Sequence, residues 1–592
     1  MPRNYSNTLL FFLLLCCGSS GLCGQDLEAV SNRLAKLKEQ KLSITGGIQL
    51  FGQTYSASGI SARRDDFQWG ARANLNLGFL GFNAPFSFVF SEANQNFNLP
   101  AYTFAGISPR YKWATLHAGD RSMAFSRYTL GGISFRGVGL QMEPGRFQIA
   151  GFYGKLNRAL AADLNSVGNL NGFYDRIGHG LRIGYGGRKT AVFANYFSAS
   201  DEQDGLPVTT ELNQALLPTA NKVVSTELRQ MIGKRITFSS ELAHSAFNAD
   251  QNAVALPNNE RDFGNELFGL FSPNESTLTG QAYNLGLNYV HDKFGVQGRY
   301  ERITRGFRTL GSLFFNNDTE NITLGFNRSL LEGKLNLFVN GGLERTNLDA
   351  EENESTDRLI GSLNVTYRPN EDWIYTGSYS NFRNDTKLRA RTDLTIPVDS
   401  IFLAQVNQSA NLTILRQLGT EQRPASLRLL LQHQRANSVI NDEVNDMANS
   451  RVSIAALNYS GGNPESGWQW NTGLALNLTE IGGINNRSLS PTLGLNRNFL
   501  NNALATYLQT ALGFYRQGDD GNQVFNLSFG GSYRLLNSHR IGLRATHLNR
   551  FGSALASRNF NEWYATLNYG FNFGGALGGK RSTAPAAAPV KK

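Results

Sequence analysis

Hydrophobic and polar residues alternate one by one along most of this chain, most clearly near its end. In residues 563–573, one face carries Trp563, Ala565, Leu567, Tyr569, Phe571 and Phe573, and the other carries Tyr564, Thr566, Asn568, Gly570 and Asn572. Because successive side chains of a β-strand point to opposite faces, this segment predicts a strand with one apolar, aromatic-rimmed face and one polar face.

The same alternation recurs from residue 42 onward. Apolar and polar positions oppose each other in the segments 74–79, 284–289, 335–340 and 525–534. Short turns rich in Gly, Asn, Asp and Pro alternate with longer polar loops, which is typical of up-and-down antiparallel strands. The pattern predicts 26 strands, and 24 also fits because the segment 83–116 is ambiguous. An even number places both chain ends on the same side.

The chain begins like a secreted protein. Arg3 is followed by an apolar run from Leu9 to Cys17 and by small residues up to Gly24, which predicts a signal peptide over 1–24. The apolar run is shorter than the roughly 20 residues of a membrane-spanning helix. A lipoprotein signal is the alternative, but none of the three cysteines (Cys16, Cys17 and Cys23) follows a small residue. Since all three lie in the leader, we expect neither disulfides nor a thiolate metal site.

A secretory leader followed by amphipathic strands predicts an all-β fold. Residues 42–573 are expected to form a large antiparallel up-and-down transmembrane β-barrel in a Gram-negative outer membrane. Its apolar faces would contact lipid and its polar faces would line the lumen. The mean hydropathy of −0.30 agrees with this, because about half of the strand residues face water.

Short segments flank the predicted barrel. Residues 25–41 predict a periplasmic amphipathic helix whose apolar positions are Leu27, Val30, Leu34 and Leu37. This helix would either pack under the barrel mouth or dock a partner protein. No plug domain is expected ahead of the first strand. The segment 574–592, rich in Gly, Ala, Pro and Lys, predicts a disordered periplasmic tail. Tyr569, Phe571 and Phe573 are expected to form the terminal aromatic signal for the barrel-assembly machinery.

The formal net charge is +10, but basic residues are spread along the strands without a cluster or recognition helix, so nucleic acid is not an expected partner. The polar faces of predicted strands carry Arg72, Arg182, Arg299, Arg428, Arg534 and Arg544. In one interpretation, they pair with inward acids such as Glu301 and Glu344 and stiffen the wall. In the other, they make a positive lumen that favours anions.

Catalytic and cofactor motifs do not emerge from the sequence. The seven histidines are scattered, and the string Gly574–Lys580 imitates a phosphate loop but is followed by Arg581, where that motif requires Ser or Thr. Acidic loop segments such as 349–357 lack EF-hand spacing. We therefore expect no catalytic residues, no metal and no cofactor.

The segment Gly306–Asn327, with Asn364–Pro369 and Ser378–Phe382, resembles a group of large outer-membrane β-barrel proteins of Gram-negative bacteria loosely associated with type 9 secretion. The resemblance implies location and fold. With outer-membrane lipids around it, such a barrel would pass solutes or a polypeptide through its net-basic lumen. Alternatively, it would be a scaffold that anchors or assembles a plug or surface partner protein. A barrel-embedded enzyme is the third alternative.

Overall fold

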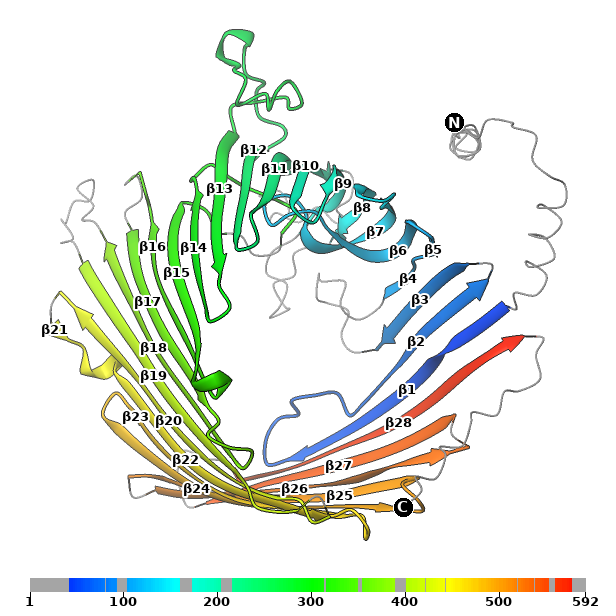
Figure 1. Ribbon diagram of the computed structural model, residues 1–592, viewed down its shortest axis with the longest axis vertical. Helices are drawn as coiled ribbons and strands as arrows, with labels where there is room; N and C mark the ends of the chain where they lie inside the picture. Colours follow the sequence, from blue (N-terminus) through cyan, green and yellow to red (C-terminus); the bar gives the residue numbers. More distant parts are fainter. Residues whose placement is uncertain are drawn as a thin grey trace.

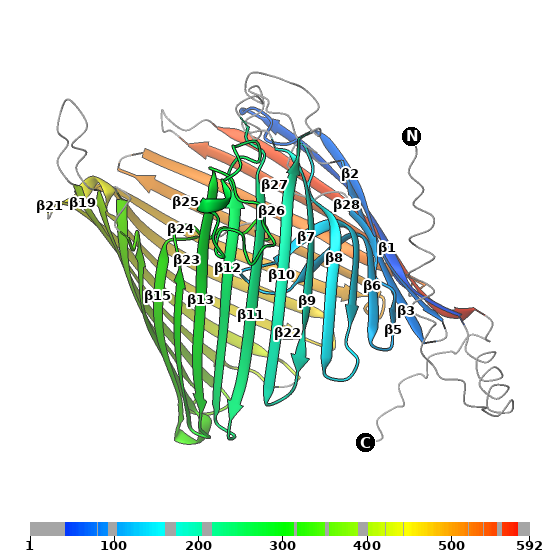
Figure 2. The same ribbon diagram turned by 90° about the horizontal axis from the view of Figure 1, so that it is seen from above.

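In the computed structural model, the described part of the chain is built around one closed antiparallel sheet (Figures 1 and 2). The structure describes residues 42–79, 81–92, 104–159, 173–203, 216–312, 316–349, 354–388, 401–420, 422–441, 443–518, 520–536, 538–552 and 559–577. The predicted signal peptide, the predicted helix with Leu27, Val30, Leu34 and Leu37, and residues 578–592 of the predicted tail lie outside the described residues.

The sheet closes where its first and last strands meet. β1 (Leu42–Ser58) pairs along its whole length with β28 (Phe560–Leu577), from Leu42 opposite Leu577 to Ser58 opposite Asn561. Along the rest of the wall, each strand pairs with the strand before it and the strand after it. Closure leaves no open sheet edge, so the backbone amides and carbonyls of the strands can be satisfied inside a bilayer.

The strand bounds follow the chain in order. The first third holds β2 (Phe67–Phe79), β3 (Phe82–Ser91), β4 (Phe104–Ile107), β5 (Arg110–Tyr111), β6 (Ala114–Ala124), β7 (Gly131–Met142), β8 (Phe147–Asn157), β9 (Asp175–Gly186) and β10 (Thr190–Glu202). The middle holds β11 (Ala220–Ile232), β12 (Ile236–Asn248), β13 (Thr277–Val290), β14 (Phe294–Ile303), β15 (Thr319–Leu330), β16 (Leu335–Thr346), β17 (Glu354–Tyr367), β18 (Trp373–Leu388) and β19 (Ile401–Gln417). The last part holds β20 (Ala425–Ile440), β21 (Glu443–Val444), β22 (Ser450–Asn463), β23 (Trp468–Ile481), β24 (Ile484–Phe499), β25 (Leu504–Gln517), β26 (Asp520–Leu535) and β27 (His539–Gly552).

These 28 segments make 26 barrel strands, as the sequence predicts. β4 and β5 share one position between β3 and β6, and the two-residue β21 pairs only with β20, so 28 − 2 = 26. In the segment 83–116, which the sequence leaves ambiguous, the described residues form strands at 82–91, 104–111 and 114–124. Pro109, which has no amide hydrogen, lies at the break between β4 and β5.

The outer face of the wall is apolar. Large hydrophobic side chains at alternate positions are exposed there, including Leu287 (53 %), Leu324 (64 %), Leu543 (52 %) and Leu567 (55 %). Aromatic residues flank this face, and Arg497 lies 4.7 Å from the ring centre of Trp468. Among the described residues, helices are limited to three short 3₁₀ turns: η2 (Asn258–Glu260), η3 (Leu331–Gly333) and η4 (Asp446–Ala448). No helix in this part of the chain is long and apolar enough to cross a membrane.

The predicted C-terminal boundary of the barrel needs a small correction. The predicted barrel ends at Phe573, whereas β28 continues to Leu577. Gly574 to Leu577 lack the alternation of apolar and polar side chains, but their backbone pairs with residues Thr45 to Leu42 of β1. Backbone pairing with the first strand, which a local pattern does not report, therefore extends the last strand by four residues.

Candidate functional site: two loops inside the barrel

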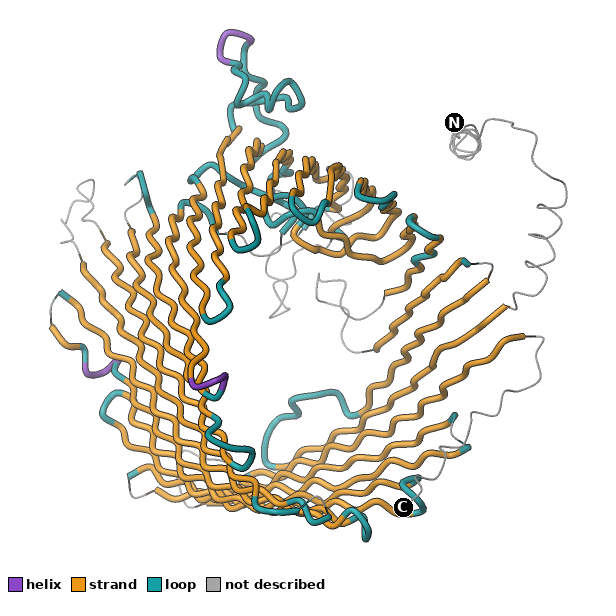
Figure 3. Tube along the Cα trace, in the orientation of Figure 1, coloured by secondary structure: helices purple, strands orange, loops and turns teal. Residues whose placement is uncertain are grey.

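Two loops fold into the barrel rather than standing above its rim. They are residues 125–130, between β6 and β7, and residues 304–312, which follow β14. They pack on the inner side of the wall formed by β7 to β14 (Figure 3). Tyr128, Leu130 and Phe307 from these loops are fully buried. We call the two segments the lumenal loops.

The lumenal loops bury a small hydrophobic core inside the barrel. Phe135, Phe152 and Phe197 lie on the inner face of β7, β8 and β10, with ring centres 5.0 Å apart for Phe135–Phe152 and 6.4 Å apart for Phe152–Phe197. Tyr128 and Phe307 join the two loops through an edge-to-face contact of 5.9 Å. Burying aromatic side chains in this way is strongly favourable, so the loops are held to the wall by apolar contact as well as by hydrogen bonds.

The lumenal loops also bind each other. The Thr309 hydroxyl donates to the Thr129 carbonyl at 3.0 Å, and the amide of Gly131, the first residue of β7 directly after the first loop, donates to the Gly311 carbonyl at 2.8 Å. A Cβ atom added at Gly311 would lie 1.9 Å from the Thr129 carbonyl oxygen. This approach requires glycine at position 311, because backbone atoms on the opposing loop would have to move to admit any side chain.

Buried polar side chains of the wall anchor the second loop. The Asn221 amide nitrogen donates to the Arg308 carbonyl at 3.1 Å, and its oxygen accepts from the Leu310 amide at 3.0 Å. The Ser245 hydroxyl accepts from the Arg308 amide at 3.0 Å. Since Asn221 and Ser245 are fully buried, losing these bonds would leave buried polar groups unsatisfied.

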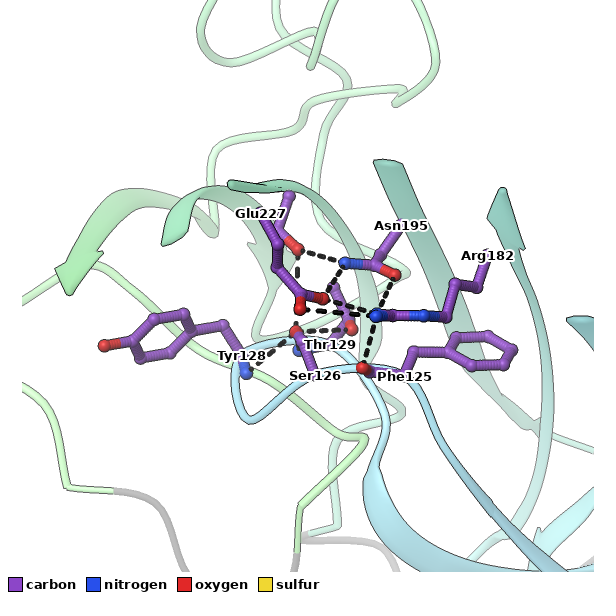
Figure 4. A network of polar contacts seen from close by, with 8 residues as sticks. Phe125, Ser126, Tyr128, Thr129, Arg182, Asn195 and Glu227 are labelled. Carbon is purple, nitrogen blue, oxygen red and sulfur yellow. Dashed lines mark hydrogen bonds and ion pairs between the residues drawn. The ribbon is translucent and has the colours of Figure 1, made fainter. Parts of the chain in front are cut away.

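A charged network fixes the first loop (Figure 4). The Arg182 guanidinium on β9 pairs with Glu227 on β11 and donates to the Phe125 carbonyl at 2.6 Å and to the Asn195 side chain at 2.8 Å. Asn195 in turn donates to Glu227 at 2.7 Å and to Ser225 at 3.0 Å. Arg182 therefore ties three strands and one lumenal loop together.

Glu301 on β14 is a second anchor. Its carboxylate accepts from Arg127 Nη1 at 2.6 Å and 2.8 Å and from the Tyr128 hydroxyl at 2.6 Å. Burial, and secondarily the hydrogen bond to Glu301, raise the pKa of the Tyr128 hydroxyl above its ordinary value. The hydroxyl therefore stays protonated and donates to the carboxylate at physiological pH.

The six predicted lumen-facing arginines all lie on the polar faces of their strands, but their surroundings differ. Arg182 is paired with Glu227, Arg299 lies 3.8 Å from Glu301, and Arg72 lies over the Phe51 ring at 5.4 Å. Within the described ranges, Arg428, Arg534 and Arg544 have no carboxylate within ion-pair distance. Arg534 faces another arginine, Arg540, directly across β26 and β27.

Charge is distributed unevenly around the inner wall. Four inward acids, Glu227, Glu241, Glu301 and Glu344, lie on β11, β12, β14 and β16, and Glu344 pairs with Arg358 at 2.9 Å. On the opposite wall, the inward Glu562 of β28 lies 3.6 Å from Arg63. The arginines without an acidic partner lie on β20, β26 and β27, away from the lumenal loops. The wall covered by the loops is thus charge-paired, and the opposite wall carries excess positive charge.

The sequence analysis missed the lumenal loops. Phe125, Tyr128, Leu130, Phe307 and Leu310 stand in segments that the strand pattern leaves as loops. Two signals pointed to them: these loops contain apolar residues, and aromatic residues interrupt the polar faces of the neighbouring strands. Both signals are weaker than the period-two alternation on which the strand predictions depend.

The predicted assembly residues Tyr569, Phe571 and Phe573 lie on the apolar face of β28, directly opposite Leu50, Ile48 and Gly46 of β1. His539 stacks on Phe571 at 4.6 Å. These residues are part of the closing seam of the barrel, and their role in recognition by the assembly machinery stays a prediction.

A closed sheet with an apolar outer face and a polar inner face defines a transmembrane β-barrel of the outer-membrane class. No family model and no curated protein matches the sequence. Among solved structures, the chain is similar to the P pilus usher (PapC) translocation pore, with 10% identity over 89% of this chain and 99% of that chain and a TM-score of 0.26.

The chain is also similar to two solved structures of receptors. BauA, the ferric preacinetobactin receptor from Acinetobacter baumannii, has 10% identity over 89% of this chain and 80% of that chain, with a TM-score of 0.38. FyuA, the ferric yersiniabactin uptake receptor from Yersinia pestis, has 10% identity over 90% and 80%, with a TM-score of 0.37. Because all three TM-scores are low, the fold and class assigned here depend on the geometry of this chain itself.

Proposed function

We propose that the protein is an outer-membrane pore through which solutes or an extended polypeptide pass. The observation that supports this most is the position of the lumenal loops, which cover the inner wall from β7 to β14. Loops attached to one side narrow a bore and leave the other side of it lined by polar strand residues.

The uncovered wall has the chemistry of a water-filled path. A recess of about 530 Å³ is lined by polar residues such as Asn496, Asn568 and Arg544, and another of about 550 Å³ includes Asn477 and Arg550. Neutral polar and basic side chains keep such a path hydrated and attract anions, because a low-dielectric wall focuses the field of the arginines. We therefore propose that small anions or acidic chains are the favoured cargo.

Recording single channels from the purified barrel in a planar bilayer tests this proposal. We expect stable openings with a preference for anions. Changing Arg534, Arg540 and Arg544 together to Gln should lower the anion preference while openings persist, because three positive charges leave the bore. The matched control is Arg328→Gln, which removes an exposed arginine opposite Leu337 on the outer face. A correctly folded barrel that never opens would contradict the proposal. Unchanged ion selectivity in the triple variant would show that ions do not pass along the wall that carries these arginines.

A scaffold that binds a partner protein is the second candidate, and the β12–β13 loop favours it. Leu267 and Phe271 of this loop pack on Val224 and Ala246. Nearby, Phe263 is 70 % exposed and Phe268 is 50 % exposed. The loop projects beyond the strand ends (Figure 1). Exposed apolar side chains at a membrane rim fit a binding surface for another protein.

The type 9 secretion association implied by the sequence resemblance would belong to this second role. A stoichiometric partner that co-purifies with the barrel and is lost in the Phe263→Ser, Phe268→Ser variant, together with silent bilayers, would favour the scaffold. Conductance that is unaltered in that variant, without a bound partner, would favour the pore.

A further inference from the structure

The lipid-facing side of β19 to β23 carries a groove of about 360 Å³. Small residues form its floor: Ala410 on β19, and Ser453 and Ala455 on β22. Leucines border it, with Leu431 of β20 on one side and Leu476 of β23 on the other. The groove exists because small side chains on one strand lie between larger ones on its neighbours.

The strand register places these residues in two adjacent rows on the outer face. One row runs from Ala410 through His433 and Ser453 to Leu478, and the next runs from Leu412 through Leu431 and Ala455 to Leu476. The four leucines of the two rows are 38–42 % exposed. An elongated apolar depression on a hydrocarbon-facing wall fits one acyl chain better than a polar solute.

Arginines stand at one end of the groove. Arg435 lies two residues beyond His433 on β20, and Arg451 lies two residues before Ser453 on β22, so both share the outer face with the groove. They face each other directly across the two strands. A second pair is adjacent, since Arg487 of β24 lies opposite Leu478 and also directly opposite Arg516 of β25. These two residues lie at the strand ends and also border the recess of about 550 Å³.

Like charges directly opposite each other destabilise a sheet unless something neutralises them. In the part of the chain that the structure describes, the only ion pair made by these four arginines joins Arg451 to Glu480 at 3.6 Å. Beside the groove itself, two arginines and one glutamate leave an excess charge of 2 − 1 = +1, and the second arginine pair adds positive charge at the same strand ends. A membrane supplies anions at this level in the phosphates of its lipid headgroups.

The end of the barrel at which the arginine pairs lie also agrees with a lipid phosphate as the ligand. The arginine pairs lie toward the same ends of the strands as the long β12–β13 loop, because β12 and β20 run in the same direction. In bacterial barrels the longer loops face the cell exterior. The leaflet at this end would therefore be the outer one, whose lipids carry phosphate groups on a sugar headgroup.

We propose that this groove and its arginines form a binding site for a phosphate-bearing lipid of the surrounding leaflet. One acyl chain lies over Ala410, Ser453 and Ala455, and a headgroup phosphate contacts Arg435 and Arg451. Arginine suits this role because its planar guanidinium binds phosphate through two parallel hydrogen bonds. A bound phosphate would also relieve the repulsion within the cross-strand pairs.

Native mass spectrometry of the delipidated full-length mature barrel tests the site, with diphosphorylated lipid A as the probe. We expect one molecule to stay bound at low concentration. The Arg435→Gln, Arg451→Gln variant should bind it about 25-fold more weakly, since each basic residue at an anionic membrane surface contributes about fivefold. Ala455→Trp, which fills the groove without removing charge, should also weaken binding. Arg328→Gln, a lipid-facing arginine away from the groove, is the matched control and should bind as the wild type does.

Two further probes separate the sources of phosphate. Dephosphorylated lipid A should bind the wild type no more tightly than it binds the double arginine variant. Inorganic phosphate alone should displace bound lipid A only poorly. Equal binding of both lipids, or unchanged binding in a folded double variant, would overturn the proposal. If inorganic phosphate displaces the lipid while Ala455→Trp changes nothing, the arginines bind free anions and the lipid site is wrong. Retained heat-modifiable migration on gels shows that each variant has folded.

Discussion

Replacing Gly311 with valine is expected to widen the bore and raise the single-channel conductance. The new side chain would begin 1.9 Å from the Thr129 carbonyl oxygen and 3.1 Å from the Phe197 ring, so the two lumenal loops would have to separate. Overpacking of this kind costs about 1–3 kcal/mol, which raises the undocked population of the loops about 5- to 150-fold. Bilayer recordings should show larger and noisier openings than the wild type.

Gly377→Val is the matched control for this experiment. Gly377 lies on β18, and a Cβ atom added there would meet no atom within 4 Å. The same change should therefore leave conductance as it is. If Gly311→Val conducts like the control while the barrel is folded, the lumenal loops do not limit the bore.

Placing an arginine at Leu476 is expected to destabilise the barrel by about 2–4 kcal/mol, because a cation on the lipid face near mid-bilayer loses its hydration. Leu476 is 40 % exposed on the outer face of β23 and lies opposite Ala455 and Leu489. Denaturant unfolding of the barrel in liposomes, followed by tryptophan fluorescence, measures the free energy of unfolding.

Asn477→Arg, at the next residue, is the control. Asn477 lies on the opposite face and lines the recess of about 550 Å³, where a longer polar side chain has room and water. This variant should unfold within about 0.5 kcal/mol of the wild type, as is usual for substitutions without a packing penalty. Similar losses at both positions would mean that the two faces of β23 are assigned wrongly.

Most of the strands were predictable from the sequence because alternation is a local property. Segments such as Leu335–Thr346 contain the period-two pattern within one strand, and both the strand count and the outer face follow from it. The predicted strand boundaries are wrong where something other than the local alternation determines them. Pro109 breaks a strand, and Gly574 to Leu577 extend another only because β1 is beside them.

The lumenal loops were not predictable in this way. Thr129 and Thr309 are 180 residues apart, and they meet only after the sheet has brought β6 and β14 to the same part of the wall. The ion pairs show the same limit. Arg182 pairs with Glu227, whereas Glu301, an expected partner of the lumenal arginines, mainly holds Arg127 and Tyr128. A residue's face can be inferred locally, but its partner depends on the register of several strands.

A cysteine scan along β23 tests the central claim most directly, namely that hydrocarbon covers one face of each strand and water the other. The three natural cysteines all lie in the predicted leader, so single cysteines at positions 473–478 can be introduced into the mature chain against a clean background. In liposomes, a charged water-soluble maleimide should label positions 473, 475 and 477 and should spare 474, 476 and 478. Uniform labelling of all six positions, or labelling of the leucine positions alone, would contradict the account.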